Sequence, residues 1–412
     1  MKLFKRILRP LFGILLLIAG GGTNVYADIS LTPEEALRID STISISLLTC
    51  EPGQKSYSLY GHTAIHYVNT ERGIDIAVNY GIFDMSKSFF VPRFILGWTD
   101  YLMGIQPYDY FCQTYAYERR GIIEQELNIP AEEKIRFAEA IEVNYKPENR
   151  EYRYNIFYNN CTTKARDMIL GSMKTTFKRK DGGPSFRELT HQCTKDYPWT
   201  ECGNDLLLGV LADRPTNVSE QQFLPFNLME DFETATICDS IPLVSATKVV
   251  VPMFNDPAEK EFPLSPTACA LIVALIIFAV TIAELVMHKR FWGFDLVLLL
   301  LIGFCGLILT AMFFSEHPTV KINLQILLLN PLAAVCLWPV VRNERRGRSH
   351  WFWNVYAVCL VLFLLGNFVQ CYAEGTNILA SSLLIWSGAK HRSVNRKLVN
   401  RKSINRKSIN RK

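Results

Sequence analysis

The stretch Tyr154–Asp167, YNIFYNNCTTKARD, places Cys161 between an extended aromatic run and a segment with helical periodicity. A second stretch, Tyr60–His66 (YGHTAIH), places His62 at the start of a segment that alternates like a strand. A cysteine acts as a nucleophile in its thiolate form, which a nearby base helps to generate. Because the thiol and the base need only meet in space, the two stretches predict a thiol–imidazole pair that the rest of the chain positions.

Two interpretations of Cys161 follow from the residues alone. A cysteine that precedes a helix over Thr162–Leu170 is expected to have a lowered pKa, because unpaired amides and the helix dipole favour the thiolate. The alternative is a structural disulfide, which is common in exported domains. Cys193 and Cys202 are close enough in sequence to pair, and their pairing would leave Cys161 free. Six cysteines precede the apolar part of the chain, namely Cys50, Cys112, Cys161, Cys193, Cys202 and Cys238.

His62 also has a structural alternative, as an ordinary hydrogen-bonded histidine. His66 lies four residues further, so in a strand the two histidines share a face and could bind zinc. No third ligand is evident nearby, so we expect no metal and no other cofactor. A catalytic imidazole usually needs a third group that orients the ring. Asn79, on the second strand of a predicted hairpin, is the first candidate, and Asp84 is the second.

The segments before the apolar region predict an α+β domain over residues 28–262. Residues 1–27 have the basic start, short apolar core and small-residue ending of an export signal, with an uncleaved anchor as the alternative. From Gly171 onward the pattern is irregular, with short helices. Strands are predicted over Ile43–Cys50, His62–Val68, Ile74–Tyr80 and Ile122–Leu127, and helices over Leu31–Ile39, Pro130–Tyr145 and Thr162–Leu170.

The C-terminal part, residues 263–389, contains apolar runs of membrane length. The connecting segments 288–290 and 342–348 are basic and should be cytoplasmic, whereas 315–321 and 372–374 should face outward. The fifth run is shorter than the ~20 residues of a straight span. Five spans are predicted, over Thr267–Met287, Leu296–Phe314, Ile322–Val341 (interrupted by Pro331), Trp351–Ala373 and Gly375–Ala389.

The net charge of +5 is concentrated in the tail, residues 390–412. Its final twenty residues are tandem NRK repeats with eight Lys or Arg and no acid, on an otherwise slightly acidic chain. This distribution is not the footprint of a nucleic-acid-binding protein. It predicts a disordered cytoplasmic tail that contacts anionic headgroups, and five spans put the tail on that side.

Several stretches are similar to one bacterial family over residues 40–385. In chain order these are SLLTCEPGQKSYSLYGHTAIHY, AVNYGIFDM, YERRGIIEQELNI, NYKPENREYRYNIFYNNCTTKARDMI, FLPFNL and HPTVKINLQILLLNPL. They resemble the family with the Lnb N-terminal periplasmic domain, found in Bacteroidetes. The motifs GHT, NYG and NNC in this order make the resemblance specific, and the repeat tail is not part of it.

The resemblance implies a permuted papain-like fold of the NlpC/P60 superfamily, in which the histidine strand precedes the cysteine helix. Relatives with this order include lecithin–retinol acyltransferase, which moves an acyl chain from a phospholipid through a cysteine thioester. The Lnb family itself is implicated in N-acylation of bacterial lipoproteins. The resemblance therefore implies a thiol-dependent acyltransferase of the inner membrane, with its N-terminal domain in the periplasm. Its partners would be a phospholipid donor and a diacylglyceryl-lipoprotein acceptor, with Cys161 and His62 as catalytic residues.

Two alternatives of other classes stay open at this point. The same thiol–imidazole pair could serve a cell-wall peptidase or amidase of NlpC/P60 type. The chain could instead be a non-enzymatic membrane sensor whose cysteines are all paired. Five spans favour a lipid substrate, because two lipid-anchored molecules must meet the thiol in the plane of the bilayer.

Overall fold

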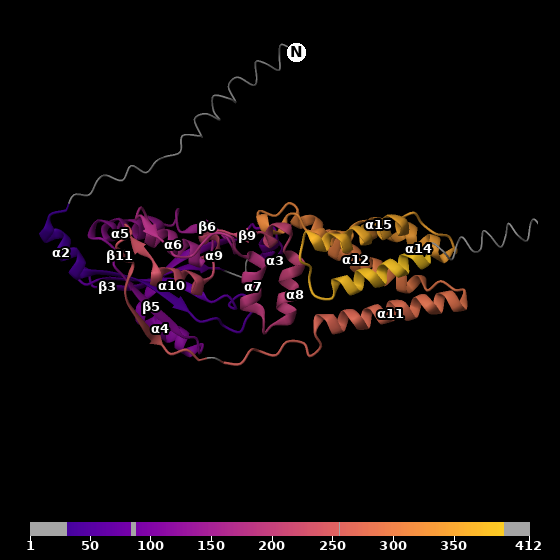
Figure 1. The fold of residues 1–412 in the computed structure, drawn as a ribbon, viewed down its shortest axis with the longest axis horizontal. Coiled ribbons are helices and arrows are strands. Elements are labelled where there is room, and N and C mark those ends of the chain that lie inside the picture. The colour runs from indigo at the N-terminus through magenta and orange to yellow at the C-terminus, as the bar shows by residue number, and fades with distance from the viewer. Residues whose placement is uncertain (1–30, 84–87, 255, 391–412) are drawn as a thin grey trace, which may run out of the picture.

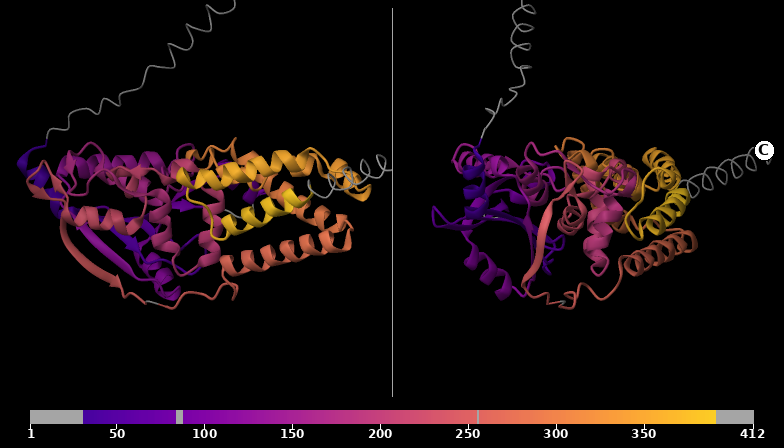
Figure 2. Two further views of the ribbon diagram at one scale, coloured as in Figure 1. Left: turned by 45° about the vertical axis from the view of Figure 1, so that its right-hand side comes forward. Right: turned by 60° about the vertical axis from the view of Figure 1, so that its left-hand side comes forward.

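The computed structural model describes residues 31–83, 88–254 and 256–390, and its two parts lie end to end (Figure 1). The N-terminal domain, residues 31–254, combines a β-sheet with helices. The C-terminal helical region, residues 266–390, extends from one end of that domain in every view (Figure 2). The predicted export signal and the repeat tail after Lys390 lie outside the described residues.

Seven strands form the central sheet of the N-terminal domain, and each neighbouring pair is antiparallel. Their order across the sheet is β12-β5-β1-β2-β3-β4-β6. The side chains of β1 are buried along nearly its whole length, as expected for a central strand of a sheet that helices cover on both faces. The strands are β1 (Ile43–Cys50), β2 (His62–Asn69), β3 (Ile74–Ile82), β4 (Asp100–Pro107), β5 (Ile122–Leu127), β6 (Glu151–Arg153) and β12 (Val244–Val251).

Helices cover both faces of this sheet because its side chains alternate between two apolar clusters. One face packs against α2 (Pro33–Thr42), α5 (Ala131–Tyr145), α6 (Cys161–Leu170) and α10 (Pro225–Thr234). The other face packs against α4 (Tyr108–Tyr117) through Phe111 and Tyr115. A short helix, α3 (Phe90–Ile95), precedes β4.

The predicted strands and helices all form, with ends that differ by a few residues. Three strands of the central sheet were not predicted, namely β4, β6 and β12. β4 contains Gly104 and ends at Pro107, and β12 is a largely exposed edge strand, so neither has a strong strand pattern. The remaining elements before β12 are β7 (Thr175–Thr176), β8 (Gly183–Ser185), α7 (Phe186–Thr194), α8 (Pro198–Leu207), η1 (Val210–Asp213), β9 (Pro215–Thr216), α9 (Val218–Gln221), β10 (Thr236–Ile237) and β11 (Ile241–Pro242).

Among the described residues, two helices of the C-terminal region are long and apolar enough to cross a membrane: α11 (Pro266–Met287) and α12 (Trp292–Met312). The second begins four residues earlier than predicted and includes the buried Asp295. The predicted fourth span becomes α15 (Phe352–Leu365) with the short η4 (Gly366–Phe368), and the predicted fifth becomes a helix over 376–390.

The third predicted span, 322–341, is wrong as a single helix. Pro331 has no N–H, so it cannot continue the hydrogen-bond pattern of a helix. The Asn330 side chain accepts the Leu332 N–H, and a new helix begins at Leu332. A Cβ on Gly303 or Gly306 of α12 would overlap the backbone of this broken segment, which explains the two glycines. The segment consists of η3 (Leu324–Leu327), α13 (Leu332–Val335) and α14 (Leu337–Arg345), preceded by η2 (Pro318–Val320).

The segments predicted to face outward pack against the N-terminal domain. Gly209 N–H donates to the Thr319 carbonyl at 2.8 Å, and Arg153 pairs with Glu316 at 3.0 Å. The backbone N–H of Cys371 donates to Asp213 at 3.2 Å. These contacts put the outward segments and the N-terminal domain on one side, in agreement with the charge pattern.

A buried ionic cluster lies at the opposite end of the helical region. Lys390, at the end of the last described helix, is fully buried and pairs with Glu284 at 2.8 Å and Asp295 at 2.7 Å. Arg290 pairs with Glu344 at 3.3 Å beside them. Lys390 was predicted to begin the solvated tail, and this is wrong, because its ammonium neutralises carboxylates from two other helices.

We predict that Lys390→Met destabilises the full-length protein in detergent by about 3–5 kcal/mol, because it leaves buried carboxylates without their cation. Thermal unfolding followed by size-exclusion chromatography would measure the loss. Lys390→Met combined with Asp295→Asn removes one of those charges and is expected to recover part of the stability. A Lys390→Met protein as stable as the wild type would contradict a stabilising role for the cluster.

Candidate active site

Cys161 is the first residue of α6 because Asn160 caps the helix. The Asn160 side-chain oxygen accepts the Thr163 N–H at 2.9 Å, and the Thr163 hydroxyl accepts the Asn160 N–H at 2.9 Å. Asn160 also donates to the Phe223 carbonyl at 2.9 Å, which fixes the cap in the domain. The first backbone N–H groups of a helix have no acceptor within the helix. The N–H groups of Cys161 and Thr162 are therefore available to donate to a negatively charged group at the start of α6.

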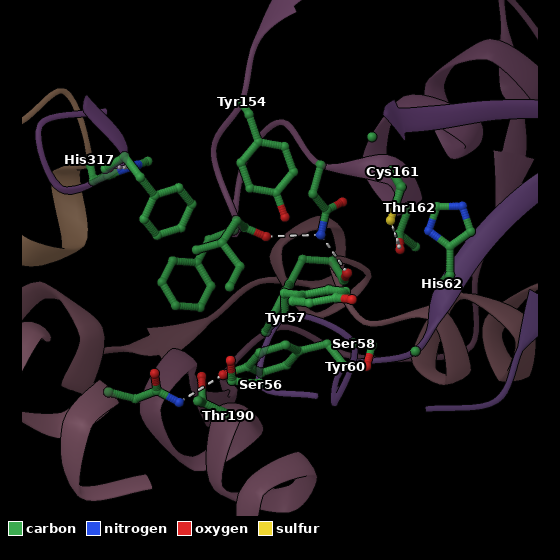
Figure 3. A pocket seen from close by; sticks show the side chains of 18 of the residues that line it. Ser56, Tyr57, Ser58, Tyr60, His62, Tyr154, Cys161, Thr162, Thr190 and His317 are labelled. Atoms are coloured by element: carbon green, nitrogen blue, oxygen red, sulfur yellow. Dashed lines mark hydrogen bonds between the residues drawn. The ribbon is translucent and has the colours of Figure 1, made fainter. Parts of the chain in front are cut away.

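The first turn of α6 packs against the first residues of β2. The hydroxyls of Thr63 and Thr162 lie 3.1 Å apart, and both side chains are fully buried. This contact brings the start of the helix to the start of the strand, so the Cys161 sulfur faces the His62 ring (Figure 3). The structure thus brings together the two residues that the sequence singled out.

Asn79 of β3 lies beside His62, as the hairpin predicted. The Nε2 atom of His62 lies 2.6 Å from the Asn79 side-chain oxygen and donates to it. That bond leaves Nδ1 for the thiol, as a general base requires. The ring is nearly parallel to Tyr115 of α4, with ring centres 6.5 Å apart. Asp84, the other candidate for the orienting group, lies outside the described residues.

The electrostatics of the pair favour a thiolate at neutral pH. Burial raises the pKa of Cys161, but His62 and the Thr63 backbone amide stabilise the anion and bring the pKa down to about 7. Burial lowers the pKa of His62, but the Cys161 thiolate and the Asn79 hydrogen bond outweigh it and raise that pKa overall. Burial raises the pKa of Cys50 to about 12 and that of Cys193 to about 11. Cys161 is therefore set apart from these two thiols as a nucleophile.

All eleven cysteines lie among the described residues, and all are free. The disulfide considered between Cys193 and Cys202 is not formed, and the disulfide interpretation of Cys161 is not supported. The sensor alternative assumed that all cysteines are paired, and the structure does not have that pairing.

His66 does not join His62 in a site. Its ring nitrogens lie 2.7 Å from a Glu124 oxygen and 2.9 Å from an Asp75 oxygen. Its ring stacks on Tyr108 with ring centres 3.6 Å apart. The described residues contain no group of three or more metal-ligating side chains that could hold an ion. His66 therefore belongs to a hydrogen-bonded cluster under α4.

Gly81 is a site residue that sequence reasoning missed. Its φ is +94°, a region that disfavours residues with a side chain, and it lies where the β3–β4 register shifts. A Cβ at this position would lie 3.5 Å from the Cys161 Cβ and 3.9 Å from the His62 Cε1. The only available signal was its place in the NYG motif, two residues after Asn79.

A cavity of about 450 Å³ opens beside the pair (Figure 3). Its volume is within the ~300–1,000 Å³ typical of small-molecule sites. Aromatic and aliphatic side chains dominate its walls, and both parts of the protein contribute to them. The wall residues of the N-terminal domain include Tyr57, Tyr60, Phe94, Ile95, Tyr101, Tyr154, Phe157, Leu207 and Phe223, and those of the helical region are Met312, His317, Thr319 and Val320.

We predict that iodoacetamide alkylates Cys161 with a midpoint near pH 7, because the thiolate forms below its ordinary pKa. In His62→Ala the stabilising cation is lost while burial remains, so the midpoint should rise above the ordinary thiol value. Alkylation rates over a pH series, read by peptide mass spectrometry, would show the shift. Identical profiles in the two proteins would rule out the ion pair.

A second prediction separates backbone strain from contact with the site. Gly81→Ala and Gly73→Ala both put a side chain at a positive φ, and each should cost about 1–2 kcal/mol of stability. Nothing lies within 4 Å of a Cβ at Gly73, so only Gly81→Ala should change the alkylation profile of Cys161. Equal profiles in both variants would show that Gly81 does not shape the site.

Comparison with known families agrees with this division of the chain. A model described as the Lnb N-terminal periplasmic domain matches residues 35–192, which include Cys161, His62 and Asn79. A model described as the Lnb transmembrane domain matches residues 257–398. No curated protein and no solved structure matches the chain. The predicted location is confirmed, with the N-terminal domain in the periplasm and the C-terminal region in the membrane, and the chain belongs to the Lnb family.

Proposed function

We propose that this protein is an apolipoprotein N-acyltransferase of the inner membrane. It would move an acyl chain from a phospholipid to the N-terminal amine of a diacylglyceryl-lipoprotein. One observation carries the proposal. The thiol–imidazole–amide group of Cys161, His62 and Asn79 opens into a largely apolar cavity whose wall includes the transmembrane domain.

In the first half-reaction, the Cys161 thiolate attacks the carbonyl carbon of a phospholipid acyl ester. Amides at the start of α6 donate to the oxygen that becomes negative. The His62 imidazolium gives its proton to the glycerol oxygen as the C–O bond breaks. The products are an acyl thioester on Cys161 and a lysophospholipid.

In the second half-reaction, the free α-amine of the lipoprotein's lipidated cysteine attacks the thioester carbon. The neutral His62 takes a proton from the attacking amine, and the C–S bond breaks to release the Cys161 thiolate. An amide forms on the lipoprotein, and the thiolate–imidazolium pair is restored. Asn79 holds the ring so that the same nitrogen serves both transfers.

The same proposal includes a permuted papain-like (NlpC/P60-type) arrangement for the periplasmic domain. Its support is the order of the two residues, with His62 on a strand before Cys161 on a helix. A peptidase or amidase with the same pair would use water or a cell-wall amine as acceptor. The apolar walls and the membrane contribution to the cavity favour the lipid substrate.

We predict that lipoproteins lose their N-linked acyl chain in cells that lack this protein and in cells that carry Cys161→Ser. Mass spectrometry of the N-terminal peptide of one abundant lipoprotein would measure this. Cys193→Ser is the matched control, because it removes a free thiol outside the site and should leave the acyl chain in place. Fully N-acylated peptide in the Cys161→Ser strain would refute this role for the thiol, unless a second acyltransferase compensates. Where a second acyltransferase is present, the purified protein can be tested directly: if it forms no thioester with phospholipid vesicles, the proposal is refuted.

A further inference from the structure

The cavity joins the nucleophile to the membrane, and its far wall belongs to the transmembrane domain. Figure 3 shows His317 and Cys161 on opposite sides of the cavity. Met312, the last residue of α12, and Val320 line the cavity as well. Both are buried in one apolar cluster with Ile95 and Leu207 of the periplasmic domain. The part of the cavity lined by Met312, Val320, Ile95 and Leu207, called the junction arm, is therefore a largely apolar space at the outer end of α12.

The junction arm has a fixed wall because α3 is tied to the loop after α12. The Ser315 hydroxyl donates to the Ile95 carbonyl at 2.8 Å, and the Glu316 N–H donates to the Leu96 carbonyl at 3.0 Å. His317 Nε2 donates to the Phe94 carbonyl at 3.1 Å. Its other ring nitrogen accepts from Asn155, in the segment that leads to Cys161, at 3.0 Å. The wall is thus held to both the membrane helix and the nucleophile segment.

Exposed aromatic side chains flank this junction. Phe314 precedes Glu316 by two residues, and Trp98 follows Gly97, which contacts Glu316. Phe314 and Trp98 have 77% and 45% of their surface exposed, and Phe89 next to α3 is 79% exposed. Large exposed aromatic residues at the end of a membrane helix are typical of the level of the lipid headgroups. An acyl chain could then pass from the bilayer into the junction arm without crossing water.

We propose that the acyl chain carried on Cys161 lies in the junction arm and that Met312 at its far wall limits the chain length. The inference rests on the proposed function. The thioester carbon is bonded to the sulfur, so the chain must begin at Cys161 and run into the space beside it. A chain in this arm is out of water along its length, and burial of its methylenes stabilises the acyl-enzyme.

The test uses purified full-length protein and mixed vesicles of phosphatidylethanolamines with lauroyl, myristoyl, palmitoyl and stearoyl chains. Intact-mass spectrometry without any lipoprotein acceptor would read the chain distribution on Cys161 directly. Met312→Trp shortens the arm and should shift the ratio of myristoyl to stearoyl by about tenfold toward the shorter chain. Met312→Ala lengthens the arm and should shift the ratio the other way, which keeps the test informative if the tryptophan variant does not fold.

Leu309→Ala is the matched control. Leu309 lies three residues before Met312 on α12 and is equally buried in the same apolar cluster, but it does not line the cavity. Its substitution should leave the chain distribution unchanged. If all variants keep the wild-type distribution on Cys161, the junction arm does not hold the donor chain, although the acyltransferase proposal stands. If only the rate of transfer to a lipoprotein changes, the arm holds a chain of the acceptor and the inference is wrong. If wild-type Cys161 is never acylated, the proposed function itself fails.

Discussion

The contact between the first turn of α6 and the first residues of β2 is the constraint on which the site depends. Thr63 and Thr162 meet there in a fully buried hydrogen bond, and the helix can start at Cys161 only because Asn160 caps it. The same asparagine is bound to the Phe223 carbonyl, on the cavity wall. One side chain therefore fixes the helix start, the position of the sulfur and part of the cavity wall.

The junction between the two domains is held by buried amide side chains. Gln325 donates to the Asp205 carbonyl at 2.7 Å, Asn323 to the Leu206 carbonyl at 2.9 Å, and Gln370 to the Leu208 carbonyl at 3.0 Å. Arg187 supports the end of α8, which accepts these bonds, through a buried ion pair with Asp205 at 2.7 Å. Buried polar groups of this kind are costly unless every partner is in place, so they specify a single docking geometry. A cavity wall shared by both domains can keep its shape only if this geometry is unique.

The site was largely predictable because its signals are local. The GHT, NYG and NNC motifs identify His62, Asn79 and Cys161, and the antiparallel hairpin of β2 and β3 places Asn79 beside His62. The role of Gly81 was not predictable, because it depends on a backbone angle and on two side chains that approach from other elements. The cavity was also not predictable, since one of its walls comes from a junction between segments that are far apart in the sequence.

The structure of the membrane part was also only partly predictable from the sequence. Hydropathy located the apolar segments, and the segments that the loop charges placed outside do contact the periplasmic domain. Hydropathy could not show that 322–341 is broken. A helix break at Pro331 leaves backbone groups that need partners inside the membrane, and Asn330 supplies one by accepting the Leu332 N–H. The prediction also placed Lys390 in solvent, because a lysine is expected at the surface unless it has buried partners. Its partners Glu284 and Asp295 lie on other helices and could not be identified from the sequence.

Under the proposed acyl transfer, burial of Cys161 would have two opposite consequences. A dry site would keep water from the thioester, so that an amine rather than water becomes the acceptor. The same dryness raises the pKa of Cys161 and would leave it a neutral thiol at pH 7. His62 offsets this cost because its charge is held next to the sulfur by Asn79, on the far side of the ring. A buried thiol without this imidazole, such as Cys193, stays protonated because burial raises its pKa to about 11. The imidazole is therefore what lets Cys161 form a thiolate beside an apolar cavity.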